Sequence, residues 1–292
     1  MFIATLIALD GLEESAIDIA RDAAASAGGL PGNWSWIDKG LAADLEIGSE
    51  AVAVRDAIEA ALPLVDVIVQ PAEHRVKKLL VADMDSTMIT VECIDELADY
   101  AGIKPQVAEV TERAMRGELD FEAALDARVA LLAGMDAAVL AICLKERVKI
   151  MPGAMVLVRT LRALGGTAIL VSGGFTHFAD AVALEIGFDR AISNRLGLVD
   201  GRLDGTVARP IVGATTKREV LLEALASLAI PACDSIAIGD GANDLLMIGA
   251  AGLGVAYHAK PKVAAAADAR VRNGDLSVLL HAMGVPKAAW VC

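Results

Sequence analysis

Aromatic residues are scarce in this chain. Phe, Trp and Tyr make up 3% of its 292 residues, although hydrophobic residues as a whole make up 55%. Alanine, valine, leucine and isoleucine therefore carry most of the apolar content, which favours parallel sheets covered by helices over a β-sandwich. The chain is long enough for one large domain or two smaller ones with a substantial core.

Basic residues are outnumbered by acidic ones. Lys and Arg total 26 against 39 Asp and Glu, which gives a formal net charge of -13. So acidic a chain has no general attraction for DNA, RNA or an anionic membrane. A local pocket can still be positive, so a small anionic substrate is compatible with this charge.

Clustered cysteines, long apolar runs and a targeting signal are also lacking. No uncharged apolar run reaches the ~20 residues that span a bilayer, and the start at 1–6 has no basic stretch typical of a signal peptide. We therefore expect a cytoplasmic, soluble protein. Ordinary reduced thiols are expected, because disulfide or thiolate-metal frameworks need closer spacing than that of Cys93, Cys143, Cys233 and Cys292.

The first 72 residues predict a small α+β module. Their apolar periodicity gives the order β-α-β-β-α-β, which is that of a ferredoxin-like fold. A linker is expected at 71–74. The predicted strands are 2–9, 34–38, 42–47 and 65–69, and the predicted helices are 13–26 and 50–61.

Residues 73–292 predict a second, larger α/β domain. Strands alternate with helices here, which indicates a doubly wound parallel sheet. A helical block at about 91–150 interrupts the alternation and is expected to form a cap over the sheet. The predicted strands are 78–82, 167–171, 235–238 and 253–257, the predicted helices are 154–164, 177–186, 217–228 and 243–250, and a hairpin turn is expected at Asp200-Gly201.

Three polar clusters directly follow predicted strands. They are Asp83-Met84-Asp85-Ser86-Thr87, Ser172-Gly173-Gly174 and Gly239-Asp240-Gly241-Ala242-Asn243-Asp244. In an open parallel sheet, ligands bind beyond the carboxyl ends of the strands. We therefore expect the three clusters to converge on one site.

The Asp83/Asp85 pair predicts a metal site. Residues i and i+2 of an extended chain point to the same side, and two close carboxylates repel unless a cation compensates. Asp240 could complete the site, and hard oxygen ligands favour Mg²⁺. The alternative is that these aspartates only cap turns and helices, which the G-D-G-x-N-D run downstream makes the weaker interpretation.

The serine-glycine loop and Lys217 are less distinctive by themselves. Ser172-Gly173-Gly174 offers a hydroxyl and backbone N–H groups to an anion, although such a run is often only a turn. A lysine such as Lys217 at the start of a helix is usually a solvated surface charge. Facing a phosphate, it would neutralise the transferring group.

Together these residues resemble the motifs of the haloacid dehalogenase superfamily of aspartate-dependent phosphatases. D-M-D-S-T, V-S-G-G-F, Lys217 and G-D-G-A-N-D occur in the superfamily's order, within a resemblance that covers roughly 77–274. The segments 91–96, 111–121 and 128–132 are similar to the phosphoserine phosphatase branch. The N-terminal element order resembles an ACT-type module, which would regulate the enzyme or mediate a homodimer; we favour dimerisation.

The resemblance implies a role for each motif residue. Asp83 would be the nucleophile that forms an aspartyl-phosphate, and Asp85 would be the general acid and base. Mg²⁺ would be bound by Asp83, the backbone carbonyl of Asp85, and Asp240. Ser172, Gly173, Lys217 and Asn243 would hold the phosphoryl group, with Asp244 orienting Lys217 or a metal-bound water.

The resemblance also implies how the cap recognises substrate. Glu92 would bind an ammonium and Arg128 a carboxylate, as a bidentate fork. Taken alone, Glu92 could be a helix N-terminal charge and Arg128 part of a solvated helix face. Met115 and Phe121 would close the pocket or belong to the core of the cap.

The implied activity is Mg²⁺-dependent hydrolysis of O-phospho-L-serine, the last step of serine biosynthesis. An alternative keeps the fold but uses another small phosphomonoester, or passes the phosphoryl group to another hydroxyl acceptor. A third hypothesis is an amino-acid sensor with a vestigial catalytic half, which the complete set of motifs argues against.

Overall fold

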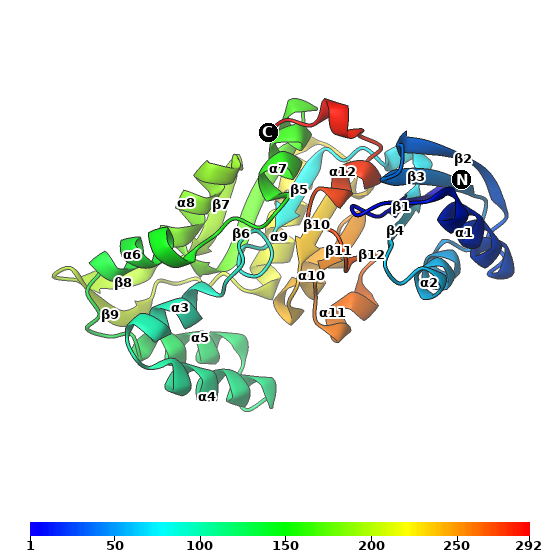
Figure 1. Cartoon of the computed structure of the whole chain (residues 1–292). Helices are drawn as coiled ribbons and strands as arrows, with labels where there is room; N and C mark the ends of the chain where they lie inside the picture. The colour runs from blue at the N-terminus through cyan, green and yellow to red at the C-terminus, as the bar shows by residue number, and fades with distance from the viewer.

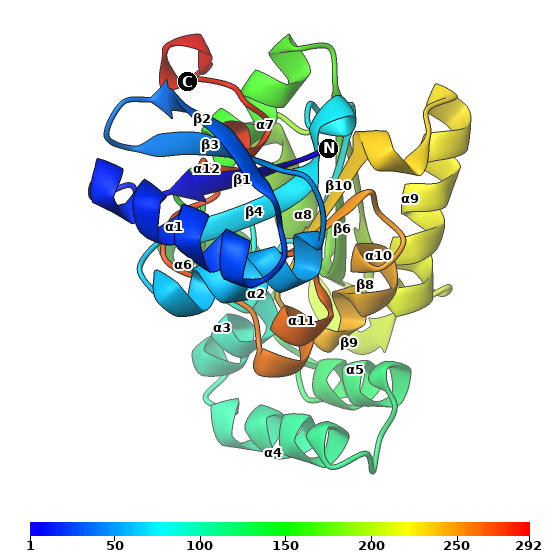
Figure 2. The ribbon, with the colours of Figure 1, turned by 90° about the vertical axis from the view of Figure 1, so that its right-hand side faces the viewer.

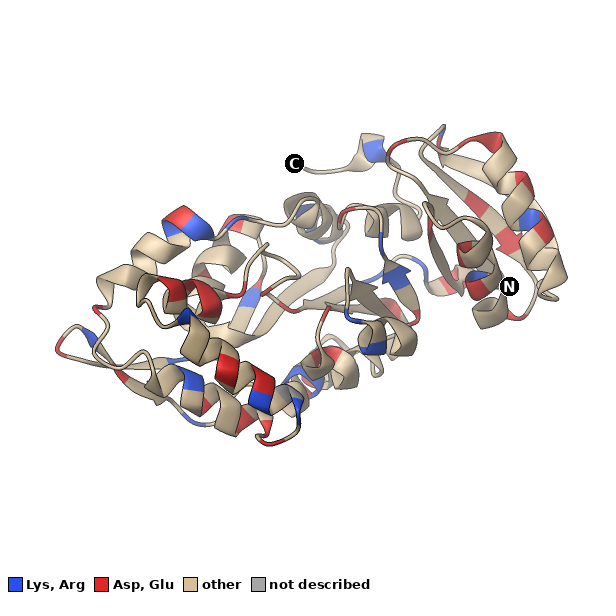
Figure 3. Ribbon diagram, turned by 60° about the horizontal axis from the view of Figure 1, so that its bottom comes forward, with Lys and Arg blue, Asp and Glu red and all other residues tan. Residues whose placement is uncertain are grey.

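The computed structural model describes residues 1–292, apart from the side chain of Met115. Two main sheets organise the chain: one lies at one end of the molecule, and the other lies in the middle, between the first sheet and the cap helices (Figure 1). The first is antiparallel with the order β2-β3-β1-β4, and the second is parallel with six strands. Charged residues of both signs are distributed over all parts of the ribbon, as Figure 3 shows.

The antiparallel sheet and its two helices form the N-terminal module. The predicted β-α-β-β-α-β order is confirmed, whereas the ACT-like assignment stays a prediction. Strand β2 begins at Pro31, three residues before the predicted start. The elements are β1 (Phe2–Ile7), α1 (Glu14–Ser26), β2 (Pro31–Asp38), β3 (Ala42–Ile47), α2 (Ala51–Ala61) and β4 (Asp66–Pro71).

Both faces of the antiparallel sheet are buried. One face packs against α1 and α2 in a core that includes Leu6, Leu45 and Val67, and both helices lie on that face in Figure 2. The neighbouring residues in the same strands, such as Ile7 and Ile68, point to the opposite face and belong to the core of the parallel-sheet domain. Because successive strand residues point to opposite faces, burial on both sides explains the apolar runs of the central strand β1 and of 67–69 in β4, whereas β2 is only partly buried.

The parallel sheet has the strand order β12-β11-β10-β5-β6-β7. The central strand β5 shows how it is covered. Leu80 and Ala82 face the core beneath α7 and α8, whereas Leu79 and Val81 face the core beneath α9 and α10. The bounds are β5 (Leu79–Ala82), α7 (Ala154–Ala163), β6 (Thr167–Phe175), α8 (Thr176–Ile186), β7 (Arg190–Asn194), α9 (Ala214–Leu228), β10 (Ser235–Gly239), α10 (Leu245–Ile248), β11 (Leu253–Tyr257), α11 (Pro261–Ala266), β12 (Ala269–Val271) and α12 (Val278–Ala282).

This strand order creates a crevice between β5 and β10. From β5 the chain builds β6 and β7 on one side, and then returns to build β10, β11 and β12 on the other. The direction of winding therefore reverses between β5 and β10, and ligands bind at such a switch point beyond the carboxyl ends of the strands. The doubly wound parallel sheet predicted from the sequence is confirmed.

The cap consists of α3 (Cys93–Tyr100), α4 (Lys104–Met115), α5 (Phe121–Ala130) and α6 (Ala138–Arg147). Gly102 and Gly117, with φ of 68° and 77°, end α3 and α4 in the left-handed conformation that glycine adopts at little cost. The hairpin of β8 (Leu196–Val199) and β9 (Arg202–Val207) contains the predicted turn. Strand β9 packs against α5, so the cap also includes residues that follow β7.

Several elements differ from expectation, and the short helices α11 and α12 were not predicted. The outermost strands β7 and β12 were not predicted, because one is short with a polar end and the other has only three residues. The helix expected at 243–250 is a 3-10 turn at Ala242–Asp244 followed by the single turn of α10. Among the described residues, none of the helices has the length and apolar character needed to cross a bilayer.

Polar contacts join the N-terminal module to the edge of the parallel sheet formed by β12. The Asp66 carboxylate, 1% exposed, accepts hydrogen bonds from the backbone N–H groups of Arg272, Asn273 and Gly274 at 2.8, 3.1 and 2.7 Å. Arg55 donates to the carbonyls of Ala267 and Asp268. The segments on both sides of β12 are therefore held by the module.

We predict that Asp66→Ala lowers the free energy of unfolding by about 3 kcal/mol, because three backbone N–H donors lose their shared, buried acceptor together. Urea denaturation followed by circular dichroism would measure the change. Asp22→Ala, at an exposed position of α1, is the matched control and should change stability by less than about 0.5 kcal/mol. Equal stability of the two variants would contradict this role of Asp66.

Candidate active site

Asp83 lies at the carboxyl end of β5, at the switch point. Its backbone N–H donates to the Ile238 carbonyl at 3.0 Å and so continues the pairing of β5 with β10. Its side chain, almost completely buried, accepts hydrogen bonds on Oδ1 from the Met84 N–H and from the Lys217 ammonium, each at 2.7 Å. Among the described residues, Oδ2 accepts none. This oxygen is therefore free to meet a metal ion or a phosphorus atom.

Lys217 bridges two carboxylates below the site. Its Nζ, on the first turn of α9, lies 2.7 Å from Asp83 Oδ1 and 2.7 Å from Asp244 Oδ1, and its side chain is fully buried. Asp244 is fixed in turn by the Gly241 N–H, which donates to its Oδ2 at 3.0 Å. Lysine at this position is thus a buried structural cation rather than a solvated surface charge.

The pKa values of this group reflect burial and mutual repulsion. Burial alone would lower the pKa of Lys217, but the carboxylates of Asp83 and Asp244 outweigh it and raise that pKa. Burial, and then the charge of Asp244, raises the pKa of Asp83 well above its usual value, against the effect of Lys217. One ammonium therefore does not fully compensate the acidic groups around it.

Asp85 lies beside Asp83 but in a different environment. Its Oδ1 accepts a hydrogen bond of 3.3 Å from the Cys93 N–H at the start of α3. Burial, and then the nearby Glu92, raises the pKa of Asp85 to about 7. A carboxyl group with this pKa is suited to give and take a proton near neutrality. A Cβ on Gly174 would lie 2.8 Å from Asp85 Oδ2, so only glycine leaves this space for the carboxyl group.

Carboxylate oxygens of Asp83, Asp240 and Asp244 lie within 4.8 Å of one another. Burial, and then Asp244 and Glu92, raises the pKa of Asp240 to about 6. The Thr87 hydroxyl lies 3.5 Å from Asp240 Oδ1. Hard oxygen donors that repel one another in a half-buried site fit a Mg²⁺ ion. Two of the predicted ligands, Asp83 and Asp240, therefore lie together with Asp244, whereas the Asp85 backbone carbonyl as a ligand stays a prediction.

The predicted anion-binding loop, Ser172-Gly173-Gly174, lies at the carboxyl end of β6. The Ser172 hydroxyl is buried and accepts a hydrogen bond of 2.8 Å from the Gly174 N–H. Gly173 lines the pocket, and a Cβ there would lie 3.0 Å from the Phe121 ring. Phe121, the first residue of α5, thus covers this loop. The Met115 side chain, predicted to share this function, lies outside the described part of the chain.

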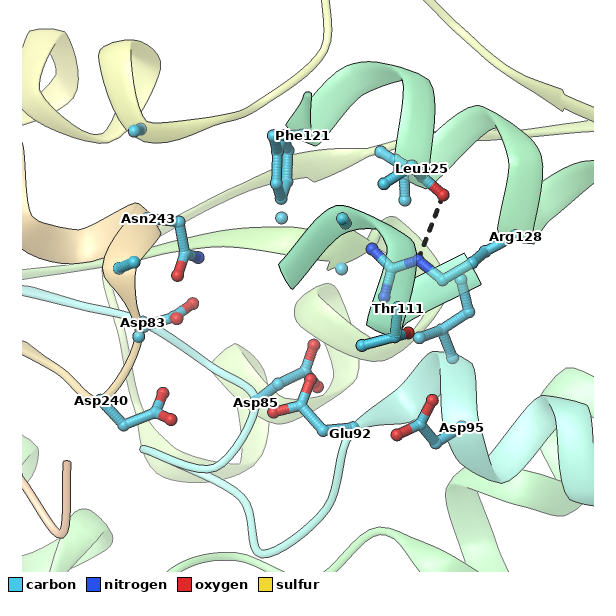
Figure 4. A pocket seen from close by; sticks show the side chains of 18 of the residues that line it. Asp83, Asp85, Glu92, Asp95, Thr111, Phe121, Leu125, Arg128, Asp240 and Asn243 are labelled. Atoms are coloured by element: carbon cyan, nitrogen blue, oxygen red, sulfur yellow. Dashed lines mark hydrogen bonds between the residues drawn. The ribbon is translucent and has the colours of Figure 1, made fainter. Parts of the chain in front are cut away.

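These groups surround one cavity of about 640 Å³ between the sheet and the cap. In Figure 4, Asp83, Asp240 and Asn243 lie on one side of it, and Arg128, Thr111 and Asp95 on the other, with Asp85 and Glu92 between them. Seven of the predicted site residues line this cavity: Asp83, Asp85, Glu92, Arg128, Gly173, Asp240 and Asn243. Ser172 and Lys217 lie behind its wall, in contact with lining groups.

Glu92 and Arg128 face the cavity from α3 and α5. Glu92 occupies the N-cap position of α3, but its carboxylate accepts from the Ser86 hydroxyl at 2.8 Å instead of capping the helix. Arg128 donates through Nε to the Ala124 carbonyl at 3.2 Å. The ion pairs found among the described side chains do not include Arg128. Its guanidinium is therefore available to an anionic ligand.

Among the lining residues that sequence reasoning missed, three have charged or hydroxyl side chains: Lys260, Thr111 and Asp95. The Lys260 N–H lies 3.3 Å from the Asp240 carbonyl. Its position just beyond β11 was a usable signal, because β11 ends at the same side of the sheet as β5 and β10. Thr111 and Asp95 had no comparable signal, since their approach depends on how the cap helices pack.

The comparisons with known proteins agree with this geometry. Residues 77–252 match the family model for haloacid dehalogenase-like hydrolases. The chain belongs to this family. The hydrolase is 46% identical over 244 residues to a phosphoserine phosphatase of Streptomyces coelicolor, a match that covers 82% of this chain and 59% of that protein.

Two further relatives extend the comparison. A phosphoserine phosphatase of Polaromonas is 47% identical over 209 residues, which cover 70% of this chain and 89% of that one. The crystal structure of a probable phosphoserine phosphatase from Vibrio cholerae superposes with a TM-score of 0.78 at 36% identity, covering 99% of this hydrolase and 87% of that chain. The hydrolase spans little more than half the length of several curated relatives that it matches.

We predict that Lys217→Met lowers the free energy of unfolding by about 3–5 kcal/mol, because it leaves two buried carboxylates without their shared cation. Thermal or urea unfolding would measure the loss. Lys262→Met, on the exposed side of α11, is the control that removes a lysine charge without a buried partner. A Lys217→Met protein as stable as this control would contradict the structural role of the lysine.

Proposed function

We propose that the hydrolase removes the phosphoryl group from O-phospho-L-serine, through an aspartyl-phosphate on Asp83. The main support is the placement of Asp83 and Asp85 at the switch point, opposite a guanidinium that has no ion-pair partner among the described side chains. The names of the relatives support the same substrate.

Asp83 acts as the nucleophile. Lys217 and the Met84 N–H hold one carboxylate oxygen and favour the ionised form, which leaves the other oxygen to attack phosphorus. The P–O bond to serine breaks as the new bond to Asp83 forms, so one difficult step becomes two easier steps. Water then attacks the aspartyl-phosphate, releases inorganic phosphate and restores the carboxylate.

Asp85 transfers the protons. In its protonated form it gives a proton to the serine oxygen that leaves, and in its ionised form it takes one from the attacking water. A pKa of about 7 allows both forms to be populated near neutrality. The Cys93 N–H holds the carboxyl group in position for both transfers, and Gly174 leaves room for it because it has no side chain.

Asp83, Asp240 and the Asp85 backbone carbonyl would hold Mg²⁺, which supplies a positive charge between the nucleophile and the phosphate. The Gly173 N–H and Asn243 lie on the cavity wall, where they can donate to phosphoryl oxygens. Ser172 and Lys217 support this wall from behind, and Asp244 orients Lys217.

The cap distinguishes phosphoserine from simpler phosphomonoesters. The Arg128 guanidinium is suited to bind the substrate carboxylate with two parallel hydrogen bonds, and Glu92 is suited to bind the ammonium. Phe121, above the Gly173 loop, excludes water from the reacting phosphate. The N-terminal module takes no part in this chemistry; that it forms a cytoplasmic homodimer remains part of the proposal.

We predict that Asp83→Asn abolishes phosphate release from phosphoserine, because an amide cannot form the covalent intermediate. The measurement is inorganic phosphate released from a panel of phosphorylated metabolites, with and without Mg²⁺. Asp22→Ala is the control and should keep full activity. Full turnover by Asp83→Asn would rule out the mechanism, and a low rank of phosphoserine in the panel would rule out the substrate.

We predict that Arg128→Ala lowers kcat/KM for phosphoserine by roughly 10–100-fold, since a charge-assisted contact is worth about 1.5–3 kcal/mol. The same variant should change kcat/KM for phosphoethanolamine, which has no carboxylate, by less than threefold. Steady-state kinetics with both substrates tests this. Equal losses on the two substrates would mean that Arg128 supports the cap rather than reading the carboxylate.

A further inference from the structure

Three potential metal ligands of different chemistry meet at the other end of β10 from the active site. They are His74, in the 3-10 turn at Ala72–His74 that follows β4, and Cys233 and Asp234, in the 3-10 turn at Ala232–Asp234 that precedes β10. A histidine nitrogen, the cysteine sulfur and a carboxylate oxygen all lie within 4.8 Å of one another. Segments about 160 positions apart in the chain therefore bring these three donors together.

We propose that His74, Cys233 and Asp234 form a binding site for a borderline divalent transition-metal ion such as Zn²⁺. Thiolate, imidazole and carboxylate ligands in one site select Zn²⁺ or Co²⁺, whereas Mg²⁺ prefers oxygen donors alone. With three protein ligands and one water, the ion completes a tetrahedral shell. The site thus differs in chemistry from the carboxylate cluster around Asp83.

The contacts around Asp234 show how an ion would enter. Its Oδ1 lies 2.8 Å from His74 Nδ1, and its Oδ2 lies 2.7 Å from the Lys78 ammonium. The Lys78 ammonium therefore occupies the carboxylate oxygen that points away from His74, and Oδ1 is the oxygen nearer the imidazole. The ion replaces the proton shared by His74 and Asp234, and the Cys233 thiol loses its proton to solvent.

Access and preorganisation also favour binding. The His74 side chain is 40% exposed, whereas the Asp234 side chain is 7% exposed, so an ion reaches the site past the imidazole. The buried Lys77 ammonium donates to the carbonyls of both His74 and Cys233, at 2.6 and 3.0 Å. These two hydrogen bonds hold the turns that carry His74 and Cys233 at a fixed separation before any ion binds. The positive charge of Lys77 opposes the binding of a cation.

A bound ion would join the connection between the two sheets to the start of β10, the strand that ends directly before Asp240. Strand β10 has five residues, so its two ends are roughly 13 Å apart at 3.3 Å per residue. The ion would therefore stabilise the junction and touch no group of the active site.

The test uses the full-length protein with Co²⁺ as the probe, in excess Mg²⁺ so that the carboxylate cluster is occupied. A thiolate bound to Co²⁺ gives a charge-transfer absorption band in the near ultraviolet, which oxygen ligands do not give. We expect one such Co²⁺ per chain. Cys233→Ser should abolish the band, and His74→Ala should weaken Co²⁺ binding at least tenfold.

Two controls separate this site from other cysteines and from the proposed phosphatase activity. Cys292→Ser removes an exposed thiol and should leave the band unchanged. Asp83→Asn should also leave the band unchanged, so this test of the metal site does not depend on the proposed reaction. Absence of the band in the unsubstituted protein, or its persistence in Cys233→Ser, would mean that the cluster is only a set of ion pairs.

Lys78 offers a further variant with the opposite expected sign. Lys78→Met removes the ammonium that competes for Asp234, so Co²⁺ should bind more tightly by severalfold; unchanged affinity would show that Asp234 is not a ligand. If Cys233→Ser does not fold, alkylation of the unsubstituted protein replaces it. Zn²⁺ should slow iodoacetamide modification of Cys233 but not of Cys292, and equal rates at Cys233 with and without Zn²⁺ would overturn the site.

Discussion

The active-site geometry depends on the buried Lys217, which holds Asp83 and Asp244 together. The lysine comes from α9, Asp83 from the end of β5, and Asp244 from the turn after β10, so one ammonium fixes three segments relative to one another. Buried charges persist only when they are paired. The two carboxylates and the lysine therefore require one another, and the crevice between β5 and β10 keeps its shape because of them.

Charge balance explains why the site needs further cations. Four acidic side chains at or near the cavity, from Asp83, Asp85, Asp240 and Asp244, exceed what Lys217 can neutralise, and the pKa values of Asp83, Asp85 and Asp240 are raised. A divalent ion would relieve this repulsion in the resting protein. The same excess of negative charge would oppose a phosphate, which is why backbone N–H groups and Arg128 on the cap matter for holding an anionic substrate.

The sequence predicted the parts of the site that sit at strand ends. Asp83, Asp85 and Asp240 follow clear apolar strands, and parallel pairing brings such ends together whatever the surrounding helices do. The burial of Lys217 and the positions of Thr111 and Asp95 could not be predicted in this way, because they depend on long-range packing of helices. Strands β7 and β12 were missed since their short sequences gain strand structure only from neighbours. The resemblance to phosphatases supplied the roles of Glu92 and Arg128, which spacing alone left undecided.

The contacts that Arg55 and Asp66 make around β12 have a consequence for solubility. A parallel sheet ends in strands whose unpaired N–H and C=O groups can recruit a strand from another chain. Here the Arg55 guanidinium donates hydrogen bonds to the carbonyls of Ala267 and Asp268, before the strand. The Asp66 carboxylate accepts hydrogen bonds from the N–H groups that follow the strand. The N-terminal module therefore closes one edge of the catalytic sheet against intermolecular β-pairing, whatever else it binds.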